Sequence, residues 1–85
     1  MNPITIYNSS KSRYETVSFD FTAENTTWFE DSDACQLHRI ADTQEGLLIQ
    51  ETGYTYPILI GGLSRADIAN DGQKALELLR QLDQL

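Results

Sequence analysis

The chain contains one cysteine, Cys35, and one histidine, His38, in 85 residues. A single cysteine excludes an intrachain disulfide, which fits a reducing compartment. A structural zinc site takes four ligands, mostly Cys and His, so that site is unexpected too. A Cys-His pair can supply a nucleophile and its base, but positions three apart on a strand point to opposite faces. We expect a buried thiol and a surface imidazole, with no catalytic residue and no bound metal.

Long apolar runs and phosphate-binding motifs are also missing. The longest apolar run, residues 57–63, is far too short to span a bilayer, and the first residues have no basic region preceding an apolar core. Gly61 and Gly62 precede an expected helix, but no Gly-x-Gly-x-x-Gly or Gly-Lys-Ser pattern accompanies them. We therefore expect no cofactor and no membrane partner, and a cytoplasmic location.

Positive charge is scarce: six Lys and Arg stand against thirteen Asp and Glu, which gives a net charge of −7. Nine of the acids lie between residues 15 and 51, where the only base is Arg39. An acidic surface repels nucleic acid and anionic membranes, because both carry the same sign. The charge predicts no direct nucleic-acid binding and leaves two interpretations, a docking surface for a basic partner or a solubilising surface.

Alternation of apolar and polar residues predicts strands at several places. The clearest is 14–22, where Val17, Phe19 and Phe21 share one face. Shorter alternating patterns occur at 4–7 and 54–60, residues 47–51 are expected as a strand on composition, and 27–30 is a further short strand candidate. Proline cannot donate a hydrogen bond to a neighbouring strand, so Pro57 predicts that the strand at 54–60 runs at a sheet edge or pairs on one side only.

Residues 33–46 fit two structures. Ala34, Leu37, Ile40 and Ala41 match a helical stripe. The alternative is a hairpin in which a strand at 35–41 pairs with the strand at 47–51 through a five-residue loop that ends in glycine. Acids at a helix C-terminus are unfavourable, and Asp42 would lie there. The hairpin is therefore slightly favoured.

The last third of the chain predicts helices. Ser64 and Asp67 have the spacing of a capping box, and residues 73–85 repeat leucine at helical intervals. A chain of 85 residues makes one domain. We expect a single α+β domain over 1–85, with a small antiparallel sheet of about four to five strands covered on one face by one or two C-terminal helices.

The acidic stretch is the candidate site. Trp28 is adjacent to Phe29, so on a strand one ring faces the core and the other faces outward as an interface anchor; the alternative is that both rings are buried under the helix. Many of the acids fall in expected turns, which predicts a compact docking tip rather than a ridge of charges that mimics nucleic acid. The predicted partner-binding residues are Asp20, Glu24, Trp28, Glu30, Asp31, Asp33, Asp42 and Glu45.

These features predict a non-enzymatic protein-binding module, an inhibitor or adaptor that docks on a basic surface, with a nucleic-acid-binding protein as one such partner. In size and charge the chain resembles small acidic phage proteins that block bacterial defence enzymes, including anti-CRISPR proteins. The alternative is a structural or assembly subunit. Apolar residues on both faces of Leu47–Ile49 and Ile58–Ile60 favour it, because both faces then need cover. Monomer and homodimer both remain open.

Overall fold

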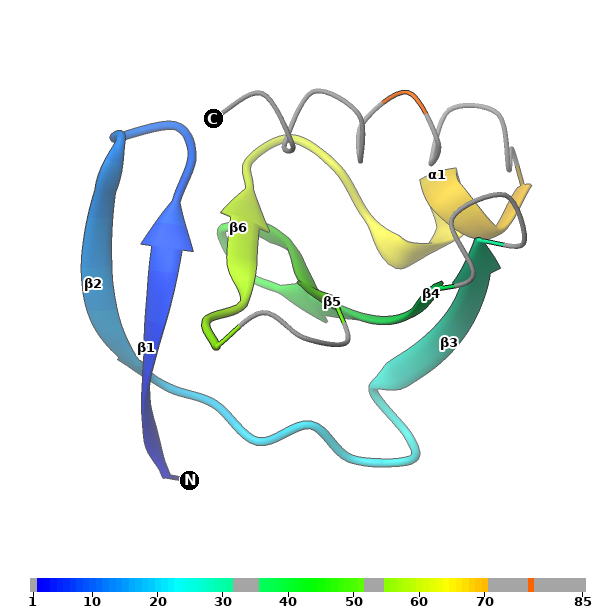
Figure 1. The fold of residues 1–85 in the computed structure, drawn as a ribbon, viewed down its shortest axis with the longest axis horizontal. Coiled ribbons are helices and arrows are strands. Elements are labelled where there is room, and N and C mark those ends of the chain that lie inside the picture. The colour runs from blue at the N-terminus through cyan, green and yellow to red at the C-terminus, as the bar shows by residue number, and fades with distance from the viewer. Residues whose placement is uncertain (1, 32–35, 52–54, 71–76, 78–85) are drawn as a thin grey trace.

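The computed structural model describes residues 2–31, 36–51, 55–70 and 77. Six strands and one short helix follow in order (Figure 1): β1 (Pro3–Asn8), β2 (Arg13–Ser18), β3 (Thr26–Asp31), β4 (Gln36–Thr43), β5 (Gly46–Glu51), β6 (Ile58–Ile60) and α1 (Arg65–Asn70). The α+β expectation therefore holds only loosely, because the described part of the chain is mostly β-structure.

The strands form one mixed sheet in the order β2-β1-β6-β5-β4-β3. β1 and β6 are parallel, and every other neighbouring pair is antiparallel. The expectation of a purely antiparallel sheet with four to five strands was therefore wrong. The expected helix over 73–85 lies, except for Glu77, outside the described residues.

β6 lies in the middle of the sheet, although Pro57 predicted an edge strand. The strand begins only at Ile58, so the missing N–H of Pro57 precedes the ladder. The carbonyl of Pro57 is used, because it accepts a hydrogen bond of 2.9 Å from the amide of Tyr7 in β1. The edge prediction was wrong because proline removes only one hydrogen-bond donor from a strand, and its carbonyl can still accept.

Residues 36–51 form the hairpin of β4 and β5, which settles the ambiguity in the sequence for the described part of that segment. Thr43 pairs with Gly46, and the loop is only two residues long. The Thr43 hydroxyl accepts from the Gly46 amide at 3.1 Å and donates to the Gly46 carbonyl at 2.8 Å. The preference for a hairpin over a helix is confirmed.

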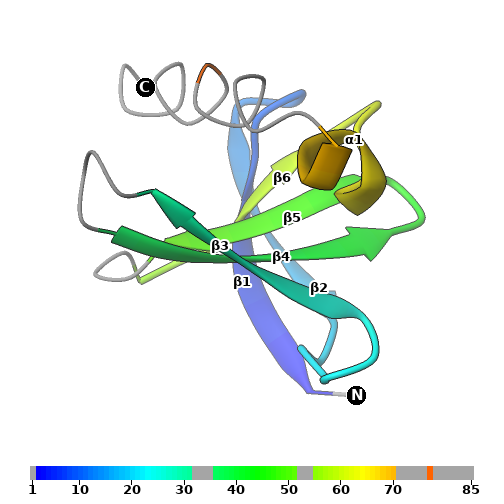
Figure 2. The same ribbon diagram turned by 90° about the vertical axis from the view of Figure 1, so that its right-hand side faces the viewer.

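The sheet buries apolar side chains on both faces. On one face, called here the helix face, Ile40, Leu47 and Ile49 pack with Ile68 of α1. Figure 2 shows α1 lying against the β4 and β5 part of the sheet. The opposite face, called here the open face, carries a second buried cluster of Ile6, Leu48 and Leu59, against which Phe19 and Phe21 pack.

The segment 19–25 joins the two edge strands of the sheet, β2 and β3. The strand expected over 14–22 ends at Ser18, and the chain then runs along the lower side of the molecule in Figure 1. Asn25 holds this segment through its side chain. Its Nδ2 donates to the Asp20 carbonyl at 2.9 Å, and its Oδ1 accepts from the backbone amide of Thr22 at 2.9 Å. The connection thereby places aromatic rings on the open face.

The helix α1 begins with the expected capping pair. The Asp67 carboxylate accepts from the Ser64 amide at 2.9 Å and from the Ser64 hydroxyl at 3.0 Å. A third residue joins this helix start from β4, since the Asp42 carboxylate accepts from the Arg65 amide at 2.6 Å. None of the helices that the structure describes is long and apolar enough to span a membrane.

Candidate functional site

The acids predicted to form one docking tip lie at two ends of the β3–β4 hairpin. Glu24 precedes β3, and its carbonyl accepts from the Arg65 guanidinium, which also lies 3.9 Å from the Asp42 carboxylate. Glu30 lies at the far end of β3. Each residue of an extended strand adds about 3.3 Å to its separation from that group. The single tip was wrong because the strand expected at 27–30, observed as β3, places Glu24 and Glu30 at opposite ends of the hairpin.

The remaining predicted residues are scattered. Glu45 is exposed in the turn between β4 and β5, near Asp42. Asp20 is half-buried in the connection after β2, where its carboxylate accepts from the Asn2 amide at 3.2 Å. The strand expected over 14–22 would have placed Asp20 on its solvent face, opposite Phe19 and Phe21, and this placement was wrong. Asp31 ends β3, and Asp33 lies outside the described residues.

Bases in the described part of the chain are used internally. Lys11 and Arg13 both contact the Glu15 carboxylate, at 3.5 and 2.9 Å. The hydrogen bond from Arg13, reinforced by one from Asn8, lowers the pKa of Glu15 below its ordinary value. Arg65 is occupied at the start of α1, as described above. The exposed carboxylates of Glu24, Glu30 and Glu45 have no base as partner among the described residues.

Arg39, the one base in the acidic stretch, holds the open face together. Its Nε donates to the Gln50 side-chain oxygen at 2.8 Å, and its Nη2 contacts the same oxygen. Its guanidinium carbon lies 3.9 Å from the centre of the Phe21 ring. This cation–π contact ties the segment 19–25 to the sheet and leaves the Arg39 charge partly covered.

Trp28 lies beside Arg39 on the open face and is 59% exposed. Thr26, Phe21 and Arg39 line a hollow of about 380 Å³ with Trp28. Leu37, diagonally opposite on β4, is 43% exposed. The outward-facing aromatic that the sequence predicted is therefore Trp28, while Phe29 packs against the core of the helix face.

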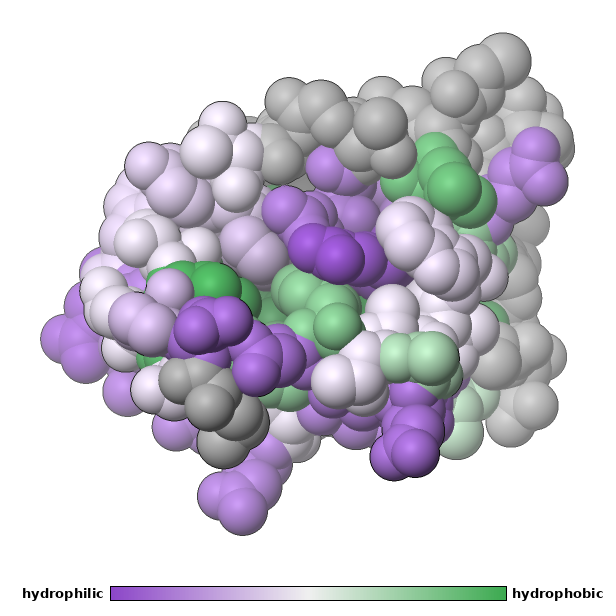
Figure 3. All heavy atoms as spheres, turned by 90° about the horizontal axis from the view of Figure 1, so that it is seen from below, coloured by the Kyte–Doolittle hydropathy of each residue, from purple (hydrophilic) through white to green (hydrophobic). Residues whose placement is uncertain are grey.

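A second hollow lies on the open face between β1, β2 and the β4–β5 turn. This apolar groove has a volume of about 680 Å³ and is lined by ten residues: Ile6, Val17, Ser18, Phe19, Asp42, Thr43, Gln44, Glu45, Leu48 and Leu59. Figure 3, which views the molecule from the side of the segment 19–25, shows apolar side chains reaching the surface among polar ones. The groove was not predicted from the sequence, although the expected placement of Val17 and Phe19 on one face of a strand indicated part of its lining.

His38 is buried, contrary to the expected surface imidazole. It is 1% exposed on the helix face, stacks against Phe29 at 6.3 Å and has Nδ1 4.0 Å from the Glu51 carboxylate. Histidine is polar, so it was expected at the surface, but His38 lies on the face of β4 that other side chains cover. Cys35, expected as a buried thiol, lies outside the described residues. Within the described ranges no three His, Cys, Asp or Glu side chains form a group that could hold a metal ion.

A third aromatic group lies on the helix-face side of β1 and β2. Tyr14 is 63% exposed and packs edge to face with Tyr7 and Tyr56, at 5.2 and 5.5 Å between ring centres. Tyr7 and Tyr14 pair across the two strands, opposite the face that carries Ile6. Tyr14 is thus as exposed as Trp28 but lies on the other side of the sheet.

Comparison with protein-family models, with curated proteins and with solved structures finds no match to this chain.

Proposed function

We propose that the chain is a non-enzymatic protein-binding module, an inhibitor or adaptor that docks on a basic surface of a partner. The observation that carries the proposal is the exposed Trp28 ring on an edge strand, with Glu24 before it and Glu30 after it, two carboxylates that contact no base in the described ranges. We call these three residues the β3 surface. Exposed tryptophans are frequent anchors of protein interfaces, and acids around them select a basic partner.

The charge distribution supports a basic partner over an acidic one. Lys11, Arg13 and Arg65 contact acceptors away from Trp28, and Arg39 places one positive charge beside the Trp28 ring; the negative field therefore comes from Glu24 and Glu30 at the two ends of β3. Such a field speeds encounter with a positive surface and is screened by salt. The size and charge resemblance to small acidic inhibitors of defence enzymes makes a nucleic-acid-binding protein the first partner class to test.

The test immobilises the purified chain and captures partners from a host lysate at ~0.1 M and ~0.5 M salt, with identification by mass spectrometry. We expect a basic protein that is retained at low salt and lost at high salt, because exposed ion pairs are screened. Trp28→Ala should abolish capture, and the double variant Glu24→Gln, Glu30→Gln should weaken it at least about tenfold, since each close charge pair contributes about 1 kcal/mol.

Tyr14→Ala is the matched control, because Tyr14 is equally exposed on the other side of the sheet. It should leave capture unchanged. Capture that survives Trp28→Ala, or that is lost equally with Tyr14→Ala, would show that the β3 surface is not the contact.

A homodimer is the second candidate. Among the described residues no strand pairs with the outer edge of β3, so a second copy could add there. Light scattering of the purified chain separates the two candidates. A monomer that captures a basic partner supports the docking module, whereas a tight dimer that Trp28→Ala dissociates and that captures no partner supports the assembly subunit.

A further inference from the structure

The apolar groove has the shape of an anchor site. Its floor is formed by Leu48 of β5 and Leu59 of β6, which are 1% and 4% exposed, and one wall by Val17 and Phe19. A volume of about 680 Å³ falls within the range of sites that bind small molecules or single large side chains. The groove is therefore large enough to bury an apolar group that comes from outside.

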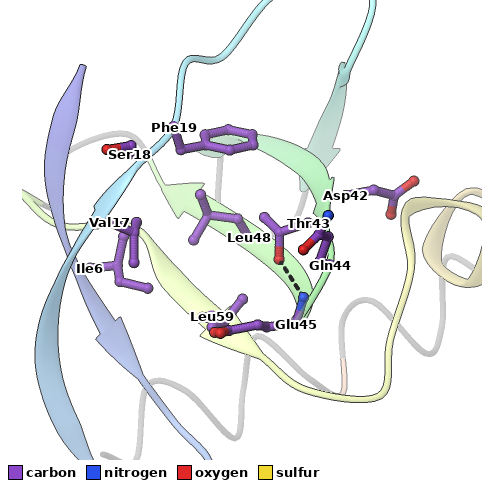
Figure 4. Close-up of a pocket in the computed structure, with 10 residues that line it drawn as sticks. All are labelled: Ile6, Val17, Ser18, Phe19, Asp42, Thr43, Gln44, Glu45, Leu48 and Leu59. Carbon is purple, nitrogen blue, oxygen red and sulfur yellow. Dashed lines mark hydrogen bonds between the residues drawn. The ribbon is translucent and has the colours of Figure 1, made fainter. Parts of the chain in front are cut away.

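The other wall is the β4–β5 turn, which carries the charge of the site. Figure 4 shows the Glu45 side chain directed along the groove toward Leu59, whereas the Asp42 side chain points away. The Glu45 amide donates to the Thr43 hydroxyl at 3.3 Å, which holds the turn in place. Gly46 fixes the end of the turn because its backbone passes too close to Ile60 for any larger residue.

The charge around the groove has one sign. Of its ten lining residues two are acidic and none is basic. A carboxylate beside an apolar surface gains most from a cation that arrives attached to an apolar group, because burial of the apolar part removes water from the ion pair. A purely apolar ligand would leave Glu45 without that partner, and an anionic ligand would be repelled.

We propose that the groove binds a basic amphipathic peptide segment of the partner, with an apolar side chain against the half-buried Val17 and Phe19, above Leu48 and Leu59, and a neighbouring Lys or Arg on the Glu45 carboxylate. The source of the peptide rests on the proposed function, but the groove can be tested on its own. The rings of Phe19 and Phe21, whose centres are 5.1 Å apart, separate the groove from the hollow at Trp28. One partner can therefore contact both.

The test uses the intact chain with labelled methyl groups and a synthetic peptide of alternating leucine and lysine, followed by NMR. We expect the methyl signals of Val17, Leu48 and Leu59 to shift, while those of Leu47 and Ile49 on the helix face stay in place. A Leu/Glu peptide and a Ser/Lys peptide of the same length should bind at least about fivefold more weakly, since each lacks one of the two contacts.

Glu45→Gln should raise the dissociation constant of the Leu/Lys peptide about fivefold, which corresponds to about 1 kcal/mol for one partly shielded ion pair. Glu30→Gln is the matched control, because it removes the same charge at the far end of β3, and should change the constant less than about twofold. Equal effects of the two variants, shifts confined to the helix face, or equal binding of the Leu/Glu peptide would overturn the proposal.

These results are independent of the lysate experiment. Loss of capture with Trp28→Ala together with no methyl shift at the groove would retain the docking module and reject the groove. Peptide binding at the groove with capture that survives Trp28→Ala would retain the groove and reject the β3 surface.

Discussion

The rings of Phe19 and Phe21 meet edge to face, with their centres 5.1 Å apart and their planes at 83°. Phe19 lines the apolar groove, and Phe21 lines the hollow beside Trp28. The segment 19–25 thus gives the open face two adjacent concave surfaces with a shared aromatic wall.

Replacement of Arg39 by lysine should lower the free energy of unfolding by about 1–2 kcal/mol. Lysine keeps the charge but loses the planar group that contacts both Gln50 and the Phe21 ring. Denaturant unfolding measures the change. Arg13→Lys, the same substitution at an exposed arginine, should cost less than about 0.5 kcal/mol. Equal effects would mean that the Arg39 contacts add nothing to stability.

Replacement of Gly46 by alanine should destabilise the fold by about 3 kcal/mol or more. Gly46 has φ of 151°, and a Cβ atom there would lie 2.2 Å from the Ile60 carbonyl oxygen. Gly62→Ala is the control: its φ of 80° also disfavours alanine, but nothing lies within 4 Å of the added atom. It should cost only about 1 kcal/mol. Thermal melts of both variants would decide, and similar melting temperatures would contradict the close approach of β5 to β6.

Replacement of Asp42 by alanine should lower the free energy of unfolding by about 1 kcal/mol. The Arg65 amide at the start of α1 would lose the carboxylate that accepts its hydrogen bond. Glu45→Ala, three residues after Asp42 and exposed in the turn, should change stability by less than about 0.5 kcal/mol. If Asp42→Ala left stability unchanged, Asp42 would be available for docking, as the sequence suggested.

Stability should decrease as the pH falls through the lowered pKa of Glu15. Hydrogen bonds from Arg13 and Asn8 favour the ionised carboxylate in the folded state. This contribution is therefore fully present above the ordinary value of 4.5 and disappears at lower pH. Arg13→Gln should move the Glu15 titration, followed by NMR, back toward 4.5. A Glu15 carboxyl that titrates at 4.5 or above in the unaltered chain would refute the argument.

Local elements were predicted well where a nearby residue decides them. The hairpin of β4 and β5 followed from the misfit of Asp42 at a helix end, and the start of α1 followed from the spacing of Ser64 and Asp67. Each of these features depends on hydrogen bonds over a few residues. The strand after Tyr14 was predicted too long, because Phe19 and Phe21 continue to face the core after pairing with β1 has ended.

The candidate site was predicted less completely. Trp28 was identified as the outward aromatic, but its acidic neighbours were expected at one tip, and the groove lined by Phe19 and Leu48 was not foreseen. The groove is formed by residues from five strands and two connections, so no short stretch of sequence contains it.

By itself the sequence determined the alternation of the strands, a turn within residues 42–46, the helix cap and the excess of negative charge, since each depends on side-chain type at short spacing; that the turn has only two residues came from the structure. Only the tertiary structure decided that β6 pairs with β1, that His38 is buried and that the acids separate to two ends of a hairpin. The pairing of Tyr7 with Ile58 joins residues far apart in the chain through backbone groups that every residue carries. Strand order, and with it the open face, therefore depends on which arrangement buries both apolar faces together.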